Sequence, residues 1–411
     1  MLSIRNIYII TIASAIVAGF SSIFTNEVKA ILFIFAIIMD AFVNKEAFRS
    51  KSLLLLIIFY FISFIYVFFL GRGHFVEIRN ILLAYPMMLM CFWVAPGLTK
   101  LNPKEARFLW YVFLLCLAEN LIVTTIIGRI NPWALRYYFS GIEGEADIIN
   151  ARAYSQQGVL SYASAHILAL LCPLIVVNAF EVKQVWKKIS LLFLAFLAIY
   201  VMYLTTITTS LLLALIFMMA VVVFYFSKGN TKRFIIWVSI LSILLLVTGG
   251  LTGLLSSSSQ GDNYEIAEKL NDVSETIMTG ESQGQIAGRE REYNLTWDAI
   301  ARNPLFGGAN GPGDTGQHSL FLDYWAYYGV FCLFFFAGWW RELKRMKRLL
   351  NNKLRSVYWI CLWPIILLCF LKGPVFLPYY VLATIVILRV GFIRIDYEQL
   401  LHVNEKDYEK K

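Results

Sequence analysis

The hydrophobic positions of this chain are grouped into runs of about 20 residues, separated by short polar segments. A run of that length, wound as an α-helix, crosses a hydrocarbon core about 30 Å thick. The expected fold class is therefore an all-α integral membrane protein, with residues 1–411 forming a single polytopic membrane domain. The pattern predicts about twelve transmembrane helices, near residues 6–24, 28–43, 52–70, 80–97, 107–127, 159–180, 189–206, 209–227, 234–255, 318–340, 356–372 and 374–392.

The charges in the connections predict how the chain is oriented. An even number of spans puts both termini on one side, and the alternate connections on that side are rich in lysine and arginine, from NKEAFRSK to RELKRMKRLLNNKLR. Short cytoplasmic loops carry such an excess, so both termini and a tail at 393–411 are expected in the cytoplasm. The opposite side has two long connections, 128–158 and a large penultimate one at 256–317, and function is expected there.

Composition narrows the classes of protein that this chain can be. Hydrophobic residues make up 59% of it and charged residues 15%, which excludes an ordinary soluble domain. The net charge of +9 does not indicate nucleic-acid binding, because no soluble module carries a clustered basic face. The six cysteines lie in apolar stretches, so neither a disulfide framework nor a Cys-x-x-Cys metal site is expected. A transporter stays an alternative, since Asp40 and Glu119, beside Asn120, are acidic groups within spans.

The long loop at 256–317 contains an amphipathic helix. Helical spacing runs over about 289–302, and an Asn-Pro pair ends it, because the residue before proline is pushed out of the helical region. On this helix Arg289, Glu292 and Tyr293 share one side, while Arg291 points nearly opposite. We expect one arginine to face a cavity and the other to stay in solvent. An ordinary hydrated helix face is the alternative interpretation.

His318 follows a glycine-rich segment, GGANGPG, and is expected to begin the next span. The segment lacks the Lys-Ser/Thr ending of a P-loop, so we interpret it as a hinge or lid rather than a nucleotide cradle, and a slack connector is the alternative interpretation. A histidine at a membrane interface is either a polar anchor or a reactive group. Asp323 is rotated from His318 by roughly 140° around a helix, so the partners of this histidine are expected from other segments.

The other outer loops add further charges. Arg152 precedes the sixth span, and Arg72 and Arg79 lie at the mouth of the fourth. Arginine forks suit phosphate oxygens, so cations that converge on one face of an apolar protein indicate a lipid pyrophosphate ligand. An acidic run before Arg152 is the best candidate for holding a divalent cation, yet such runs are usually hydrated loop, and no metal site is predicted. Its members are Glu143, Glu145 and Asp147.

The stretch GREREYNLTWDAIARNPLFGG, followed by HSLFLDYWAYYGV, resembles the loop and following span of the O-antigen polymerase and O-antigen ligase superfamily. The positions that carry the resemblance are Gly288, Arg289, Tyr293, Pro304, Gly307, His318, Ser319 and Gly329. A looser likeness, over ARAYSQQGVLSYASAHILAL, places Arg152, although Ser161-Tyr162 stands where the family has Pro-Asn. The chain also has Leu211 where the family often carries an arginine, so Arg72 or Arg79 is expected to supply that contact.

The resemblance implies a family C type glycosyltransferase fold, with its site on the outer face of a bacterial cytoplasmic membrane. The implied donor is a saccharide on undecaprenyl pyrophosphate, and the implied acceptor is a hydroxyl of another lipid-linked repeat unit. Transfer would invert the anomeric carbon and use no cofactor. Arg289, Arg152, Arg72 and Arg79 would hold the pyrophosphate, and His318 would take the acceptor proton or bind phosphate. The positions implied to shape the loop are Gly288, Tyr293, Pro304, Gly307 and Gly329.

The short distance from Pro304 to His318 favours a polymerase over a ligase that joins the glycan to lipid A-core, since ligases often have an insertion there. A lipid-linked oligosaccharide flippase is the alternative outside enzymes. The implied partners are the lipid-linked donor and acceptor, the bilayer, a chain-length regulator and a flippase, and no nucleic acid.

Overall fold

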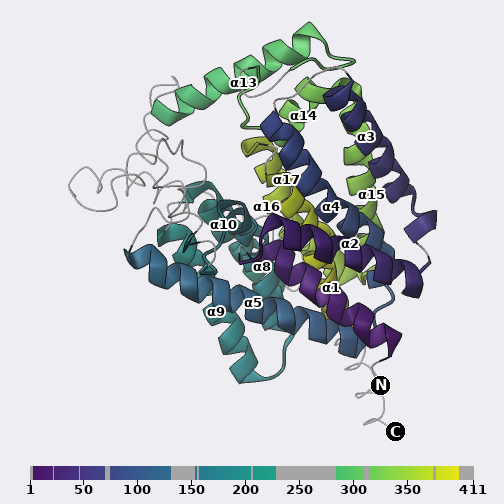
Figure 1. The fold of residues 1–411 in the computed structure, drawn as a ribbon. Coiled ribbons are helices and arrows are strands. Elements are labelled where there is room, and N and C mark those ends of the chain that lie inside the picture. Colours follow the sequence, from purple (N-terminus) through teal and green to yellow (C-terminus); the bar gives the residue numbers. More distant parts are fainter. Residues whose placement is uncertain are drawn as a thin grey trace.

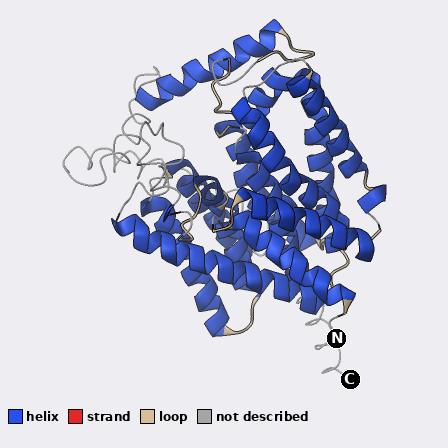
Figure 2. Ribbon diagram, viewed as in Figure 1, coloured by secondary structure: helices blue, strands red, loops and turns tan. Residues whose placement is uncertain are grey.

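The computed structural model of the chain describes residues 3–21, 23–45, 47–69, 75–130, 153–154, 157–204, 207–227, 284–309, 314–373 and 376–397, and only the backbone at 75–84, 208 and 284–286. All regular structure in these ranges is helical (Figure 2). The α-helices are α1 (Ile4–Phe20), α2 (Asn26–Val43), α3 (Lys51–Phe68), α4 (Phe75–Leu98), α5 (Pro103–Ile130), α7 (Tyr162–His166), α8 (Leu168–Glu181), α9 (Val185–Leu204), α10 (Thr208–Phe226), α13 (Gly284–Arg302), α14 (Leu320–Tyr328), α15 (Cys332–Leu349), α16 (Asn352–Leu371) and α17 (Leu377–Val381). Short turns are η1 (Ala47–Arg49) and η2 (Gly329–Phe331), and η4 (Leu382–Ile387) is a π-helical stretch that continues α17.

Each expected span except 234–255, which lies outside the described residues, has a helix at its position. Seven helices in the described ranges are long and apolar enough to cross a membrane. The chain is therefore a multi-pass membrane protein, as its hydropathy predicts. The count of twelve spans and the family C fold stay predictions.

Capping side chains mark where many of the helices begin. A serine, threonine or asparagine before the first turn accepts a backbone N–H that has no partner within the helix. These caps are Ser3, Thr25, Ser50, Ser161, Ser319 and Asn351.

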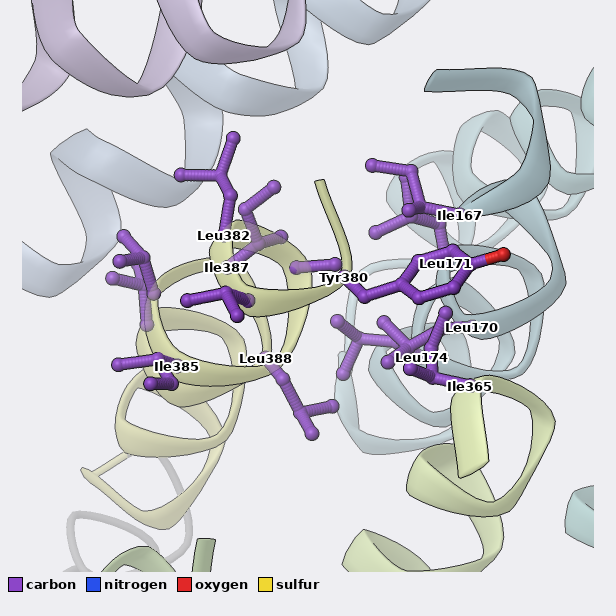
Figure 3. Close-up of a cluster of buried hydrophobic side chains, with 14 of the residues drawn as sticks. Ile167, Leu170, Leu171, Leu174, Ile365, Tyr380, Leu382, Ile385, Ile387 and Leu388 are labelled. Carbon is purple, nitrogen blue, oxygen red and sulfur yellow. The ribbon is translucent and has the colours of Figure 1, made fainter. Parts of the chain in front are cut away.

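The last helix, Leu377–Tyr397, is the most buried of the candidate spans, with 89% of its apolar window inside the protein. Tyr380 extends from it toward α8 (Figure 3). The labelled side chains around it are Ile167, Leu170, Leu171, Leu174, Ile365, Leu382, Ile385, Ile387 and Leu388. The other helices thus pack around the C-terminal one, although it comes last in the sequence.

Buried charges tie this central helix to its neighbours. Arg389 and Glu342 are both 1% exposed, and Nη2 of the arginine lies 2.9 Å from Oε2 of the glutamate. The same guanidinium donates to the carbonyl oxygen of Ala95 on α4, and Arg394 donates to Asn178 Oδ1 on α8 at 2.6 Å. Because an unpaired charge is costly inside a membrane protein, these contacts join α4, α8 and α15 to one helix.

The acidic groups that pointed to a transporter make local contacts or are exposed. Asp40 is buried and accepts a 3.0 Å hydrogen bond from Asn44, one turn later at the end of α2. Asn120 donates to the Cys116 carbonyl of its own helix at 2.7 Å. Glu119 is exposed on α5. These groups do not by themselves outline a polar path through the bundle.

The first and last described helices meet at the same end of the bundle. Arg5 at the start of α1 donates to the Lys100 carbonyl at 3.1 Å, and the Tyr397 hydroxyl donates to the Leu101 carbonyl at 2.7 Å. This agrees with an even number of spans. The last helix extends to Tyr397, and Arg394 within it donates a hydrogen bond to Asn178. Residues 393–397 of the expected tail at 393–411 are therefore helical.

Two further boundaries differ from those expected. The span predicted to begin at His318 begins at Leu320, because Ser319 caps it, and η2 divides it into α14 and α15. The expected connection at 341–355 is largely helical, since α15 runs on to Leu349 and α16 begins at Asn352.

Candidate functional site

The candidate site lies where α13 crosses one end of the bundle. Figure 1 shows α13 lying across the end that also holds α14. Ala299 and Ile300 on the second half of α13 form a small apolar cluster with Ala326 on α14. The first half of the helix, which begins at Gly284 rather than near 289, is polar. The expected amphipathic helix of the long loop is thus present and is anchored by its C-terminal half.

The loop before α14 lies directly on α13 at Gly316. A Cβ added at Gly316 would lie 2.3 Å from the carbonyl oxygen of Glu292, so only glycine fits this approach. The Gly316 N–H donates to the buried Thr296 hydroxyl at 3.0 Å. That hydroxyl lies 3.2 Å from Asp323 Oδ1, and Asp323 Oδ2 accepts the Ser319 N–H at 3.2 Å. One connected set of hydrogen bonds therefore joins α13, the loop and the start of α14.

This loop brings His318 to the side of α13 that carries Glu292. Nε2 of His318 contacts Oε2 of Glu292, and both side chains are partly exposed. Burial lowers the pKa of His318, and the cations Arg289 and Lys372 lower it further. The contact with the Glu292 carboxylate acts in the opposite sense, and burial together with the two cations outweighs it. The imidazole is thus neutral at neutral pH.

His318 takes its partners from other segments, as the spacing predicts. Asp323 bonds to Ser319 and Thr296 instead, so it serves the loop and the helix start. Tyr293 links α13 to the end of α16: its hydroxyl donates to the Phe370 carbonyl at 2.7 Å. Burial raises the pKa of Tyr293, so its hydroxyl keeps its proton.

Lys372 enters the site from the chain that follows α16. Its carbonyl oxygen accepts the N–H of Leu320 at 2.8 Å, and the next residue, Gly373, packs against the carbonyl of Gln317. Gln317 has the left-handed backbone conformation, with φ of 53°. These backbone contacts fix Lys372 beside the loop that carries His318, and its charge lowers the pKa of that histidine.

The two arginines of α13 differ as predicted. Arg289 is half-buried, and its charge acts on both His318 and Tyr293. It has no hydrogen bond or ion pair with any residue that the structure describes. Arg291 is exposed. The helical spacing thus separates the two arginines by their exposure, and that Arg289 faces a cavity stays a prediction.

The Asn-Pro turn after α13 docks on the break between α14 and α15. Gly307 and Gly329 both have positive φ, 66° and 56°, and face each other closely: a Cβ at either would lie within 2.7 Å of the other's backbone nitrogen. The Val330 N–H donates to the Leu305 carbonyl at 3.0 Å, and the Pro304 carbonyl accepts from Trp325 at 2.9 Å. Glycine is thus required at both positions of this contact.

Several predicted site positions are not placed beside His318. Arg72 and Arg152 lie outside the described residues, as do Glu143, Glu145 and Asp147. For Arg79 only the helical backbone is described. Gly288 lies within α13, and a Cβ there would meet nothing within 4 Å, so no packing requirement explains this glycine. The described residues contain no group of three or more histidines, cysteines or acids that could hold a metal ion.

Lys372 and His166 were not singled out from sequence, and Glu292 was placed on the side of α13 that carries Arg289 but was given no partner. Lys372 was hidden at the end of an apolar run, and the contact of Glu292 with His318 depends on how the loop folds back. Deeper in the bundle, Nδ1 of the buried His166 lies 2.5 Å from the Ser210 hydroxyl. A lysine at the end of a span, on the side of the long loops, is the sequence signal that could have identified Lys372.

Comparison with known families and proteins bears on this same region. Residues 193–337 match the family model described as O-antigen ligase, and this range includes Arg289, Glu292 and His318 but not Lys372. Neither a search of curated proteins nor a search of solved structures found a match. Together with the motif around Arg289 and His318, the match at 193–337 supports the similarity of this part of the chain to O-antigen polymerases and O-antigen ligases.

Proposed function

We propose that this protein is a surface-polysaccharide polymerase of the bacterial cytoplasmic membrane. It transfers a glycan from undecaprenyl pyrophosphate to a hydroxyl of another lipid-linked repeat unit. Both termini would lie in the cytoplasm, and α13 with its site would face the outside. The observation that carries the proposal is Arg289, a half-buried cation without an anionic partner in the described residues, beside a neutral His318.

The leaving group explains the cations of the site. A pyrophosphate gains negative charge as the glycosidic bond breaks, so an enzyme for this reaction has to position two sugars and stabilise that charge. Arg289 can do so with a fork of N–H donors. Lys372 supplies a second positive charge nearby. It can contact the phosphate where the family often has an arginine and this chain has Leu211. The other expected phosphate contacts are Arg152, Arg72 and Arg79.

His318 fits the role of general base better than that of phosphate ligand. A phosphate ligand would be protonated, whereas burial and two neighbouring cations lower the pKa of this imidazole. A neutral imidazole can take the proton of the acceptor hydroxyl as its oxygen attacks the anomeric carbon. Attack from the side opposite the pyrophosphate inverts that carbon. No cofactor takes part in this scheme.

The proposal is tested with Arg289→Ala and the matched control Arg291→Ala. Loss of a charge-assisted contact to phosphate costs about 1.5 to 3 kcal/mol, or roughly one to two decades in rate. We expect Arg289→Ala to remove the ladder of long surface polysaccharide on a gel while the protein stays in the membrane. Arg291→Ala should keep the ladder. Equal effects of the two substitutions would contradict the assignment of Arg289 to the site.

A ligase is the second candidate, since the matching family model bears that name. The two reactions differ in their acceptor, so purified protein separates them. A polymerase lengthens a lipid-linked repeat unit supplied alone, whereas a ligase consumes it only when lipid A-core is present. Accumulation of single lipid-linked units on the inner leaflet in cells without the protein would instead indicate a flippase.

A further inference from the structure

The two ring nitrogens of His318 have different surroundings. Nε2 contacts Oε2 of Glu292, and that oxygen is shielded from solvent and has no other partner among the described residues. Nδ1 has no hydrogen-bond partner in the part of the chain that the structure describes. A carboxylate on one nitrogen fixes which nitrogen carries the proton of a neutral imidazole, and it leaves the other nitrogen free to accept one.

The contact between Glu292 and His318 is set by the backbone rather than by two mobile side chains. Gly316, two residues before the histidine, packs on the backbone of Glu292 itself and donates to Thr296 one turn along α13. On the other side of the histidine, the Ser319 N–H is held by Asp323. The register of the loop on α13 is therefore fixed on both sides of His318. Although both side chains are partly exposed, their approach is set by this backbone register and not by the weak attraction of an exposed ion pair.

The remaining charged groups around His318 have other roles. Arg289 from α13 and Lys372 from the end of α16 oppose protonation of the imidazole. Tyr293 lies on the same side of α13, and its hydroxyl is engaged by the Phe370 carbonyl. Asp323 on α14 is occupied by backbone and hydroxyl donors. Glu292 is thus the carboxylate that contacts the imidazole.

We propose that Glu292 is a positioning residue that holds His318 with its proton on Nε2, so that Nδ1 is the base in glycosyl transfer. This rests on the proposed function. The acceptor oxygen forms its bond to the anomeric carbon, the bond from that carbon to the pyrophosphate oxygen breaks with its electron pair, and the acceptor proton moves to Nδ1. The imidazolium that forms is stabilised by Glu292, as in other carboxylate–histidine pairs. The proton then leaves to water.

The test compares Glu292→Gln with Glu290→Gln in purified protein that elongates a lipid-linked repeat unit. Glu290 is exposed two residues earlier on α13, which makes it a matched control. We expect Glu292→Gln to lower kcat about 10- to 100-fold or more, since 10- to 100-fold is the range for losing the carboxylate partner of a metal-bound histidine. The KM for the donor should stay within about twofold, because the pyrophosphate contacts remain. Glu292→Asp should recover part of the rate.

Two further measurements separate positioning from a general structural effect. Removing the carboxylate lowers the pKa of His318 further, so the acid limb of the pH–rate profile should move to lower pH. The double variant His318→Ala with Glu292→Gln should be no slower than His318→Ala alone, because residues that act as a unit are not additive.

An unchanged kcat in Glu292→Gln, or a double variant whose losses multiply, would overturn the inference. Failure of the proposed function has a different signature, since wild-type protein would then not elongate the lipid-linked unit at all. A Glu292→Gln protein whose thermal unfolding in detergent falls well below that of Glu290→Gln, with the acid limb unmoved, would also overturn it, because the role would then be structural.

Discussion

Replacing Thr296 by valine should detach the loop that carries His318 from α13 without changing the volume of the side chain. Thr296 is 2% exposed. Its hydroxyl accepts a hydrogen bond from the Gly316 N–H at 3.0 Å and lies 3.2 Å from Asp323 Oδ1. Valine has the same shape and cannot make either contact. The substitution therefore tests the hydrogen bonds and leaves the packing nearly intact.

The magnitude follows from what is left without a partner. A buried polar group that loses its hydrogen bond costs about 1 to 3 kcal/mol. Asp323 is fully buried and loses the Thr296 hydroxyl while it keeps the Ser319 N–H, whereas Gly316 is half-buried and can bond to water, so its share is smaller. A total of about 2 to 4 kcal/mol corresponds to roughly 30- to 1000-fold more frequent opening of the loop.

Hydrogen exchange followed by mass spectrometry measures this opening directly. Peptides that cover Gly316 to Ser319 should exchange faster in Thr296→Val by that factor, and elongation should slow because His318 is held less often in place. Thr11→Val is the matched control: Thr11 is also buried, but its hydroxyl bonds only to the Ile7 carbonyl of its own helix, at 2.8 Å. Equal exchange of the loop in wild type and Thr296→Val would refute the reasoning.

Four other predictions concern the same site. Because the pKa of His318 is lowered, the elongation rate should rise with pH through a value below that of a free imidazole and be level near neutrality; a rate that falls as pH rises through that value would show a protonated phosphate ligand instead. Lys372→Gln should raise the donor KM roughly tenfold, the effect of one charge-assisted contact, while Lys104→Gln, on the exposed start of α5, should leave it unchanged; equal KM values would remove Lys372 from the site. Gly329→Ala should yield little folded protein by size-exclusion chromatography, because its Cβ would lie 2.2 Å from the Leu305 carbonyl oxygen at a positive φ; a normal yield would contradict that contact. Elongation should continue in a chelator, and a rate lost with EDTA and restored by Mg²⁺ would show a metal-dependent site.

The sequence predicts most of the membrane helices because hydropathy acts locally. Each span has to be apolar over its own length, so the pattern is readable without knowing what the helix packs against. The same holds for α13, where spacing alone separates Arg289 from Arg291. The start of α14 was predicted two residues too early, at His318, because the capping role of Ser319 was not recognised; the helix begins at Leu320.

The partners of His318 could not be predicted in this way. Its contact with Glu292 joins residues 26 positions apart and depends on the loop folding back at Gly316. Lys372 is more distant still and reaches the site only because α16 ends beside α14. Periodicity says which face a residue is on, and it says nothing about which other segment lies against that face.

The positions that carry the family resemblance fall into two sets. The glycines allow close backbone contacts, and Arg289 and His318 offer the proposed functional side chains, which depend on those contacts. Gly307 and Gly329 have no side chain to offer a substrate; they let the turn after α13 lie against the break between α14 and α15. That contact and the cap at Ser319 hold the two ends of α14, while Gly316 holds the loop on α13. In the proposed mechanism Arg289 contributes charge and His318 a basic nitrogen, and both depend on those fixed backbones for their positions.

It follows that the two sets should fail differently when they are changed. Substituting Gly307, Gly316 or Gly329 should prevent folding, because a Cβ would overlap backbone atoms that cannot move independently. Substituting Arg289 or His318 leaves the backbone contacts in place and removes only the chemistry. Gly288 is the exception among the glycines, because a Cβ there would meet nothing within 4 Å, and so no backbone contact in the described residues requires a glycine at this position.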